Sequence, residues 1–186
     1  MKVNPIREPE KVTAIKEAMI QDGKLRLAFL FILGVNTGFR VSDLVRVKYE
    51  DIRNKEELRL KEQKTGKYRS VSITPKVHEA LRLIDQGQTG CIFLSESNRT
   101  KAKANKLWGR QYITQELKYY AALAGVKQNV GTHTMRKTFG YFHYKINNNL
   151  ALLQESLNHS STQSTLRYIG IIQEDINKSV MQLNLG

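Results

Sequence analysis

Apolar residues recur at three- and four-residue steps along most of the chain, which is the period of a helix with one buried face. Residues 25–35 are apolar on nearly all sides and predict a central buried helix that ends at Asn36-Thr37-Gly38. Pro9 is suited to the first turn of a preceding helix. Further helical stripes occupy residues 77–84, 113–124, 135–146, 150–157 and 171–183.

A different period occurs between residues 58 and 73. Leu58-Arg59-Leu60 and residues 69–73 alternate between apolar and polar positions, and Lys64-Thr65-Gly66-Lys67 between them is typical of a tight turn. The pattern predicts a β-hairpin with positive charge at its tip. Residues 91–94 are predicted to form a third short strand. The expected fold class is therefore mixed, mainly α with a small antiparallel β-sheet.

The helix predicted from residue 132 carries the first candidate chemistry. Thr132 is suited to be its N-cap, and His133 and Arg136 share a face of its first turn. A helix N-terminus attracts anions through its free N–H groups, so an arginine and an imidazole there could hold a phosphate. Taken alone, such a pair is more often a surface arginine beside a capping histidine. The predicted buried face of this helix consists of Met135, Phe139, Phe142 and Ile146.

The balance of charges points to a partner class. The 186 residues include 30 lysines and arginines against 17 aspartates and glutamates, which gives a net charge of +13. Such an excess favours a polyanion, first of all nucleic acid, although a merely basic soluble protein has the same composition. The single cysteine, Cys91, is expected to be buried, which fits a reducing, cytoplasmic compartment. No apolar run is long enough to span a membrane, so no membrane partner is expected.

Five short segments follow one another in a particular order along the chain. They are Thr37-Gly38-Phe39-Arg40-Val41-Ser42-Asp43-Leu44, Lys64-Thr65-Gly66, His133-x-x-Arg136, Leu157-Asn158-His159-Ser160 and Tyr168. In order and spacing this set resembles the catalytic domain of the tyrosine recombinases, the lambda-type phage integrase family. The resemblance extends from about Pro9 to the C-terminus.

The chain departs from that family at a few points. Asn158 stands where the family usually has glycine, and we expect the turn to survive because asparagine tolerates left-handed backbone. Lys137 follows the second arginine, at a variable position. Family members generally carry an N-terminal helical domain that clamps DNA. We expect residues 1–186 to be a single catalytic domain without this core-binding domain, either as a fragment or as a protein that works without the clamp.

The resemblance implies a site-specific DNA recombinase or integrase with the tyrosine recombinase catalytic-domain fold. Such an enzyme cleaves and rejoins DNA strands through a 3′-phosphotyrosyl intermediate. Guanidinium groups suit its phosphate site, because they stay charged and donate hydrogen bonds in pairs. No cofactor and no metal are expected. The implied catalytic residues are Arg40, Lys64, His133, Arg136, His159 and Tyr168.

Each of these residues has an implied role. Tyr168 would attack the phosphate, with His133 as its base or proton shuttle, because a phenol with a pKa of about 10 needs help losing its proton. Lys64 would protonate the leaving 5′-oxygen. His159 would hydrogen-bond a phosphate oxygen beside the two arginines. Asp43 is interpreted as a buried carboxylate that holds or neutralises the arginine cluster.

The implied partner is double-stranded DNA, on which the protein would form a homo-tetramer while remaining a monomer without it. In a bacterium or phage-infected cell this implies a nucleoid-associated location. Residues 171–186 are expected to form a tail helix that packs on its own domain without DNA and on a neighbouring protomer in the assembly. The predicted DNA-binding residues are Lys67, Arg69, Arg99, Lys101, Lys103, Lys106 and Lys137.

Three other functions remain open at this point. A type IB topoisomerase-like enzyme uses a similar site but relaxes DNA as a monomer. A non-catalytic DNA-binding remnant of an integrase would be expected to have lost some of the six catalytic residues. A general RNA-binding protein would not require the ordered set at all.

Overall fold

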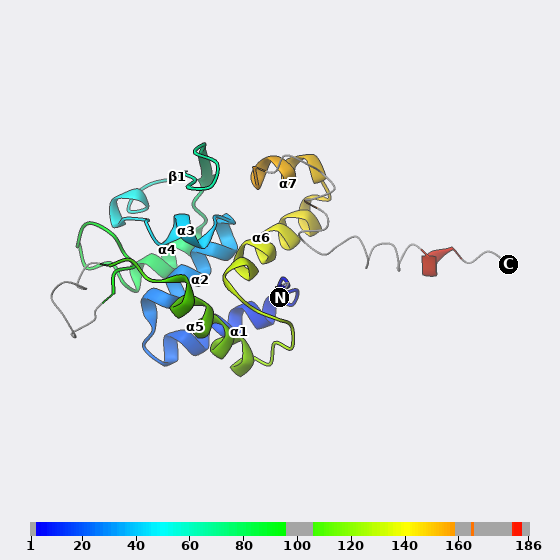
Figure 1. Cartoon of the computed structure of the whole chain (residues 1–186), viewed down its shortest axis with the longest axis horizontal. Coiled ribbons are helices and arrows are strands. Elements are labelled where there is room, and N and C mark those ends of the chain that lie inside the picture. Colours follow the sequence, from blue (N-terminus) through cyan, green and yellow to red (C-terminus); the bar gives the residue numbers. More distant parts are fainter. Residues whose placement is uncertain (1–2, 96–105, 159–164, 166–179, 184–186) are drawn as a thin grey trace.

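The computed structural model of the protein describes residues 3–95, 106–158, 165 and 180–183. These parts are mainly helical and include a two-stranded antiparallel sheet (Figure 1), as the sequence predicted. The helices are α1 (Pro9–Gln21), α2 (Leu25–Thr37), α3 (Val41–Leu44), α4 (Pro75–Arg82), α5 (Arg110–Leu123), α6 (Thr132–Asn147) and α7 (Leu150–Ser156). The strands are β1 (Glu57–Lys61) and β2 (Tyr68–Ser72), preceded by a 3₁₀ turn, Tyr49–Asp51.

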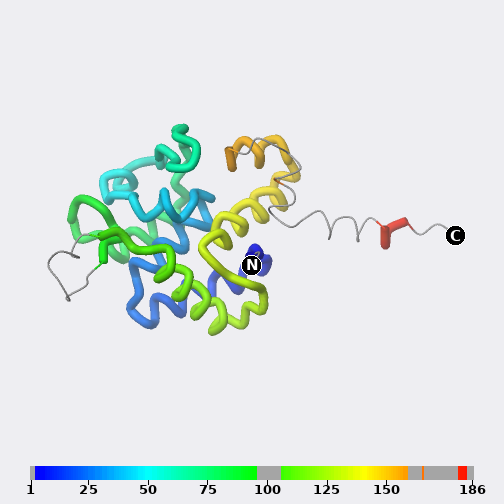
Figure 2. Tube along the Cα trace, viewed as in Figure 1, coloured from blue at the N-terminus to red at the C-terminus, as the bar shows by residue number. Residues whose placement is uncertain are grey.

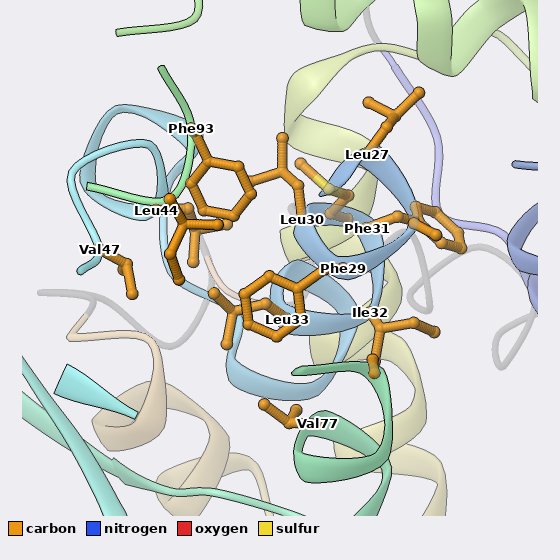
Figure 3. Close-up of a cluster of buried hydrophobic side chains, with 14 of the residues drawn as sticks. Leu27, Phe29, Leu30, Phe31, Ile32, Leu33, Leu44, Val47, Val77 and Phe93 are labelled. Carbon is orange, nitrogen blue, oxygen red and sulfur yellow. The ribbon is translucent and has the colours of Figure 1, made fainter. Parts of the chain in front are cut away.

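Helix α2 forms the centre of the core, which confirms the prediction for residues 25–35. It packs against α1, α3, α4 and α6. Figure 3 shows its apolar side chains pointing outward on several sides, toward Phe93 and Leu44 on one side and toward Val77 on another. Leu30 and Leu33 have no exposed surface. Truncating either side chain to alanine should lower the free energy of unfolding by about 2–5 kcal/mol, because an empty cavity would remain in the core.

The predicted hairpin is present, with residues 62–67 joining its two strands. Leu58 pairs with Val71, and Leu60 pairs with Arg69, so these four side chains face the same side of the sheet. Leu58 is buried, which identifies that side as the inner one. The prediction of a third strand at residues 91–94 is wrong. Within the described residues that segment forms only isolated bridges, and its Ile92 and Phe93 are buried in the core.

Helix α6 begins one residue earlier than predicted from capping. Gly131 is the N-cap, and its N–H donates to Thr134 Oγ1 at 3.1 Å, whereas Thr132 is the first helical residue. The hydroxyl three residues into the helix therefore supplies the cap. The predicted buried face also stops early, because Ile146 in the last turn is 79% exposed.

Helices α2 and α6 cross without room for additional atoms. A Cβ added at Gly34 would lie 2.7 Å from Met135 Sδ. A Cβ added at Gly38 would collide with the ring of Phe139, and Gly38 also has a positive φ of 64°. Glycine meets both requirements at position 38, because it has no Cβ and adopts positive φ freely. This crossing holds the segment that follows α2 against α6.

The N-terminal segment lies beside α6 (Figure 2). Ile6 N–H donates to Thr138 Oγ1 at 2.9 Å, and Lys137 Nζ donates to the Val3 carbonyl at 2.9 Å. Lys137 is buried. In this structure the ammonium group of Lys137, predicted to bind DNA, binds a main-chain carbonyl of the N-terminal segment instead.

Most of the predicted tail helix lies outside the described residues. Residues 180–182 are helical, and Val180, Met181 and Leu183 are all exposed. The expectation that the tail packs on its own domain is therefore not met by this part of it. In the parts of the chain that the structure covers, no helix combines the length and apolar character needed to cross a membrane.

Candidate active site

A buried carboxylate, that of Glu62, lies at the centre of the candidate site. It follows β1 directly and has no exposed surface. Its Oε1 accepts a hydrogen bond from Arg40 Nη1 at 2.8 Å and lies 3.5 Å from Arg136 Nη1. Its Oε2 accepts from Thr65 Oγ1 at 2.9 Å and from Asn158 Nδ2 at 3.2 Å. Residues from four separate segments therefore converge on one acidic side chain.

Both predicted arginines belong to this cluster. Arg40 is the N-cap residue of α3, and Arg136 lies in the first turns of α6. Arg136 is 1% exposed; its Nη1 donates to the Gly38 carbonyl at 2.8 Å and its Nη2 to the Leu157 carbonyl at 2.5 Å. The α2–α6 crossing brings the two arginines together, because Gly38 and Arg40 follow α2 directly.

The charges explain how Glu62 stays ionised in the interior. Burial alone would raise its pKa, but the hydrogen bond from Thr65 and the charge of Arg40, with further help from Asn158, outweigh burial and hold the pKa below its usual value. The arginines are neutralised in turn. Unpaired buried charges are costly, so the cluster is stable only as a set.

Glu62 has the role that the sequence predicted for Asp43. Asp43 is buried, but its Oδ1 accepts from the Gln63 N–H at 2.9 Å and so fixes the start of the hairpin turn. A signal for Glu62 was present, because Leu58, Leu60 and Glu62 occupy alternate positions and thus one face of the strand. The charged residues on either side of Glu62 instead suggested that it belongs to the solvent-exposed turn of the hairpin.

Arg69 also differs from its prediction as a DNA-binding residue. Its side chain is buried on the inner face of the hairpin, over the ring of Phe39, and donates to the Thr37 carbonyl at 2.6 Å. Burial, together with the nearby charge of Arg136, lowers the pKa of Arg69 to about 10. Within the described residues, Nε and Nη1 of this guanidinium have no hydrogen-bond partner. Arg69 is thus a structural cation behind the site.

The remaining predicted cations are placed at the surface or lie outside the described residues. Lys64, Lys67 and Lys106 are exposed, the first two in the hairpin turn. The other predicted positions lie outside the described residues: His159, Tyr168, Arg99, Lys101 and Lys103.

His133 and Arg136 both belong to the first turns of α6, but the His133 side chain is exposed whereas that of Arg136 is buried. It is exposed beside a hollow of about 450 Å³ that is also lined by Arg110, Lys118 and Lys137. Partial desolvation of the ring, with the positive charge of Arg110 next in importance, lowers the pKa of His133. A neutral imidazole is therefore favoured near pH 7, as a proton acceptor requires.

The turn that leads into the predicted His159 lies next to the same cluster. Figure 1 shows α7 running back above α6 toward the hairpin. Asn158, just after α7, has a positive φ of 51°, which confirms that asparagine preserves the left-handed turn here. The arginines, the hairpin turn and this turn thus meet at one place, where a phosphate and two proton-transfer groups could be brought together.

Comparisons with known proteins agree with this arrangement. Residues 6–174 match the model of the phage integrase family. A probable integrase/recombinase, YoeC of Bacillus subtilis (strain 168), is 34% identical over 97% of this chain and 96% of its own length. Tyrosine recombinase XerA of Pyrococcus furiosus is 29% identical over 95% of this chain, which spans only 60% of that relative.

Solved structures show the same fold. XerH site-specific recombinase bound to a palindromic difH substrate, in a post-cleavage complex, matches with a TM-score of 0.71 at 19% identity, over 96% of this chain and 53% of that one. A lambda integrase tetramer bound to a Holliday junction matches with a TM-score of 0.68 at 17% identity, over 90% and 48%. The family match, the YoeC relative and this shared fold together show that the chain belongs to the phage integrase family.

Proposed function

We propose that this protein is a site-specific DNA recombinase that cleaves and rejoins strands through a 3′-phosphotyrosyl intermediate. The observation that carries the proposal is the convergence of Arg40 and Arg136 on one anion, Glu62, beside the turn that bears Lys64. A pair of guanidiniums that binds a carboxylate has the charge and geometry to bind a phosphodiester. Chains of this family are tyrosine recombinases, which makes strand transesterification the reaction to test.

The proposed step exchanges one phosphodiester for another. The Tyr168 oxygen attacks phosphorus, a phosphorus–tyrosine bond forms, and the bond to the 5′-oxygen breaks. Negative charge spreads over the phosphate oxygens in the transition state, and the two arginines stabilise it there. Donors of this kind typically contribute a factor of about 10²–10³ each to the rate. The bond energy is retained, so rejoining needs no external energy.

Two protons move in that step. His133, neutral because its pKa is lowered, accepts the phenolic proton of Tyr168. Lys64, exposed in the hairpin turn, gives a proton to the departing 5′-oxygen. His159 donates a hydrogen bond to a phosphate oxygen. Because the two arginines and Lys64 supply positive charge, the proposed chemistry uses no metal.

The proposed substrate is double-stranded DNA, bound as a homo-tetramer by a chain that is monomeric without it. The XerH complex, which has this fold and is bound to a difH substrate, supports DNA as the substrate. The lambda integrase tetramer bound to a Holliday junction supports the tetramer. The net charge of +13 supports a polyanionic substrate. The cations still proposed to contact DNA are Lys67, Arg99, Lys101, Lys103 and Lys106.

A nicked suicide duplex tests the proposal, because it traps the covalent intermediate when the released fragment diffuses away. In excess EDTA, the wild-type protein should give a denaturant-stable adduct whose mass maps to Tyr168. Tyr168→Phe should bind the same duplex with unchanged Kd and give no adduct, since only the hydroxyl is removed.

An adduct that persists in the phenylalanine variant would contradict the nucleophile. Loss of cleavage in EDTA that Mg²⁺ restores, with DNA binding intact, would contradict the metal-free site. Relaxation of a one-site plasmid without joining of two sites would point instead to a topoisomerase activity.

A further inference from the structure

The turn at Asn158 does more than a glycine could do there. Its left-handed backbone is a conformation that glycine adopts easily. The asparagine side chain adds a donor, and Nδ2 reaches Glu62 Oε2 at 3.2 Å. The preceding residue, Leu157, accepts from Arg136 through its carbonyl. The turn is therefore attached to the arginine cluster by both its backbone and its side chain.

The hairpin turn is attached to the same cluster from the other side. Thr65 Oγ1 donates to Glu62 Oε2, and the Gly66 N–H donates to the Glu62 carbonyl at 2.8 Å. The Gln63 N–H is held by Asp43. Lys64 lies between two residues that are each fixed to a buried carboxylate, although its own side chain is exposed.

We propose that Glu62 is a positioning residue for strand cleavage, a role that rests on the function proposed above. One carboxylate oxygen holds the arginine pair. The other holds Thr65 and Asn158, and it thereby sets the turn that carries Lys64 against the turn that leads into His159. Glu62 thus aligns groups that bind phosphate with groups that move protons, without contacting DNA itself.

The physical basis is the cost of leaving a buried charge partly unpaired. Hydrogen bonds to charged groups are stronger than neutral ones, and their strength rises where water is excluded. Exposed turns are otherwise among the most mobile parts of a fold. A single carboxylate that accepts from two such turns removes much of that freedom, and small misplacements of catalytic groups have large effects on rate.

Two variants separate the proposed links. Asn158→Gly keeps the left-handed turn and removes only the side-chain donor. Glu62→Gln keeps the shape of the side chain but removes the charge that pairs with the arginines. The matched control is Glu57→Gln, which removes an exposed carboxylate from the same hairpin, where Ser70 Oγ donates to it at 2.7 Å.

Three quantities are measured for each variant. They are the rate of adduct formation on saturating suicide duplex, the Kd for an intact duplex, and hydrogen exchange of the Gln63 and Gly66 amides in the DNA-free protein. Asn158→Gly should slow adduct formation about tenfold and speed amide exchange, with Kd changed less than about twofold. Glu62→Gln should slow adduct formation about a hundredfold. The double variant should be no slower than Glu62→Gln alone, because the two changes break one link.

The outcomes distinguish this proposal from the proposed function. Wild-type rate and wild-type exchange in Asn158→Gly would overturn the role of Glu62, even if Glu62→Gln failed to fold. Equal effects of Glu62→Gln and Glu57→Gln would overturn it as well. If the wild-type protein forms no adduct, the proposed function fails, and amide exchange alone decides: faster exchange in Asn158→Gly supports the link, and unchanged exchange overturns it.

Discussion

The guanidiniums of Arg40, Arg69 and Arg136 share one region with the carboxylates of Glu62 and Asp43. Three positive charges against two negative ones leave one positive charge in excess. A phosphodiester carries one negative charge, so its arrival would complete the pairing rather than disturb it. Breaking a buried pair by removing one member typically costs about 3–5 kcal/mol, so changes to this set affect stability and chemistry together.

His133 should set the acid limb of the reaction. Its pKa is lowered from the ordinary value of 6.5 by partial desolvation and by Arg110. The neutral base therefore persists below pH 6.5, and the rate of adduct formation should fall only at more acidic pH. Arg110→Gln removes the charge and should move the acid limb toward higher pH. A pH–rate profile of single-turnover cleavage on the suicide duplex measures the acid limb of the wild-type protein and of the variant.

The same shift has a consequence for stability. A histidine with a lowered folded pKa binds protons more readily when unfolded, so it contributes stability above pH 6.5 that is lost as pH falls through the folded pKa. His133→Asn should remove that part of the pH dependence and also the acid limb. An acid limb that stays in place in both Arg110→Gln and His133→Asn would show that another group is the base.

Some residue roles could be predicted from sequence and others could not. The pairing of Arg40 with Arg136 came from ordered motifs, and the structure brings the two together. Arg69 was assigned to the surface because it is charged, yet alternation with Val71 already placed it on the inner face. Glu62 was missed for the same reason. A charged residue is not a reliable sign of exposure when the alternation of the strand places it on the inner face.

At the scale of elements, periodicity predicted most of the fold. Helices α1, α2, α4, α5, α6 and α7 and the hairpin all match stripes or alternation in the sequence. Two local predictions were wrong. Residues 91–94 have strand-like composition but lack a continuous neighbouring strand among the described residues. The N-cap of α6 is Gly131, whose N–H donates to Thr134 Oγ1. Both outcomes depend on tertiary neighbours, which a local pattern does not contain.

The tail is the element with the clearest untested role. Its apolar positions recur at helical spacing, and the described end exposes Val180, Met181 and Leu183. Apolar surface left in water costs roughly 25 cal/mol per Å², so a covering partner is expected. A neighbouring protomer on DNA would supply one. Deleting residues 173–186 should weaken assembly on two-site DNA at least about tenfold while leaving single-site binding nearly unchanged.

Sedimentation on one-site and two-site duplexes measures the two quantities separately. A matched control is the triple change of the exposed apolar residues Val180, Met181 and Leu183 to serine, which keeps the length of the chain. Equal assembly by the deleted and full-length proteins would show that the tail has no part in joining protomers.

At the scale of the whole molecule, the net charge of +13 should govern DNA affinity. Counterion release predicts a steep linear fall of log K with log salt, with a slope of about −0.9 for each phosphate contacted. Lys67→Gln should reduce that slope by about one, because Lys67 is exposed at the hairpin turn. Arg69→Gln should leave the slope unchanged and lower the melting temperature instead, because Arg69 is buried.

Binding titrations from 50 to 300 mM salt, with thermal melts of the same samples, measure both effects. A slope that falls equally in the two variants would place Arg69 at the DNA surface after all. A flat dependence in the wild-type protein would remove the nucleic-acid interpretation of the charge.

The tight crossing of α2 and α6 also limits how this sequence can vary. A Cβ at Gly34 would lie 2.7 Å from Met135 Sδ and 3.0 Å from Met135 Cβ, so a larger residue at position 34 requires the Met135 side chain to move or to be replaced by a smaller one. In a library that randomises both positions, selection for folding should return alanine at position 34 only with a residue smaller than methionine at position 135. Position 38 is more restricted, since its φ is positive and a Cβ there would also collide with the Phe139 ring. The two helices that position the arginines should therefore diverge as a linked pair, while the exposed hairpin turn varies independently of them.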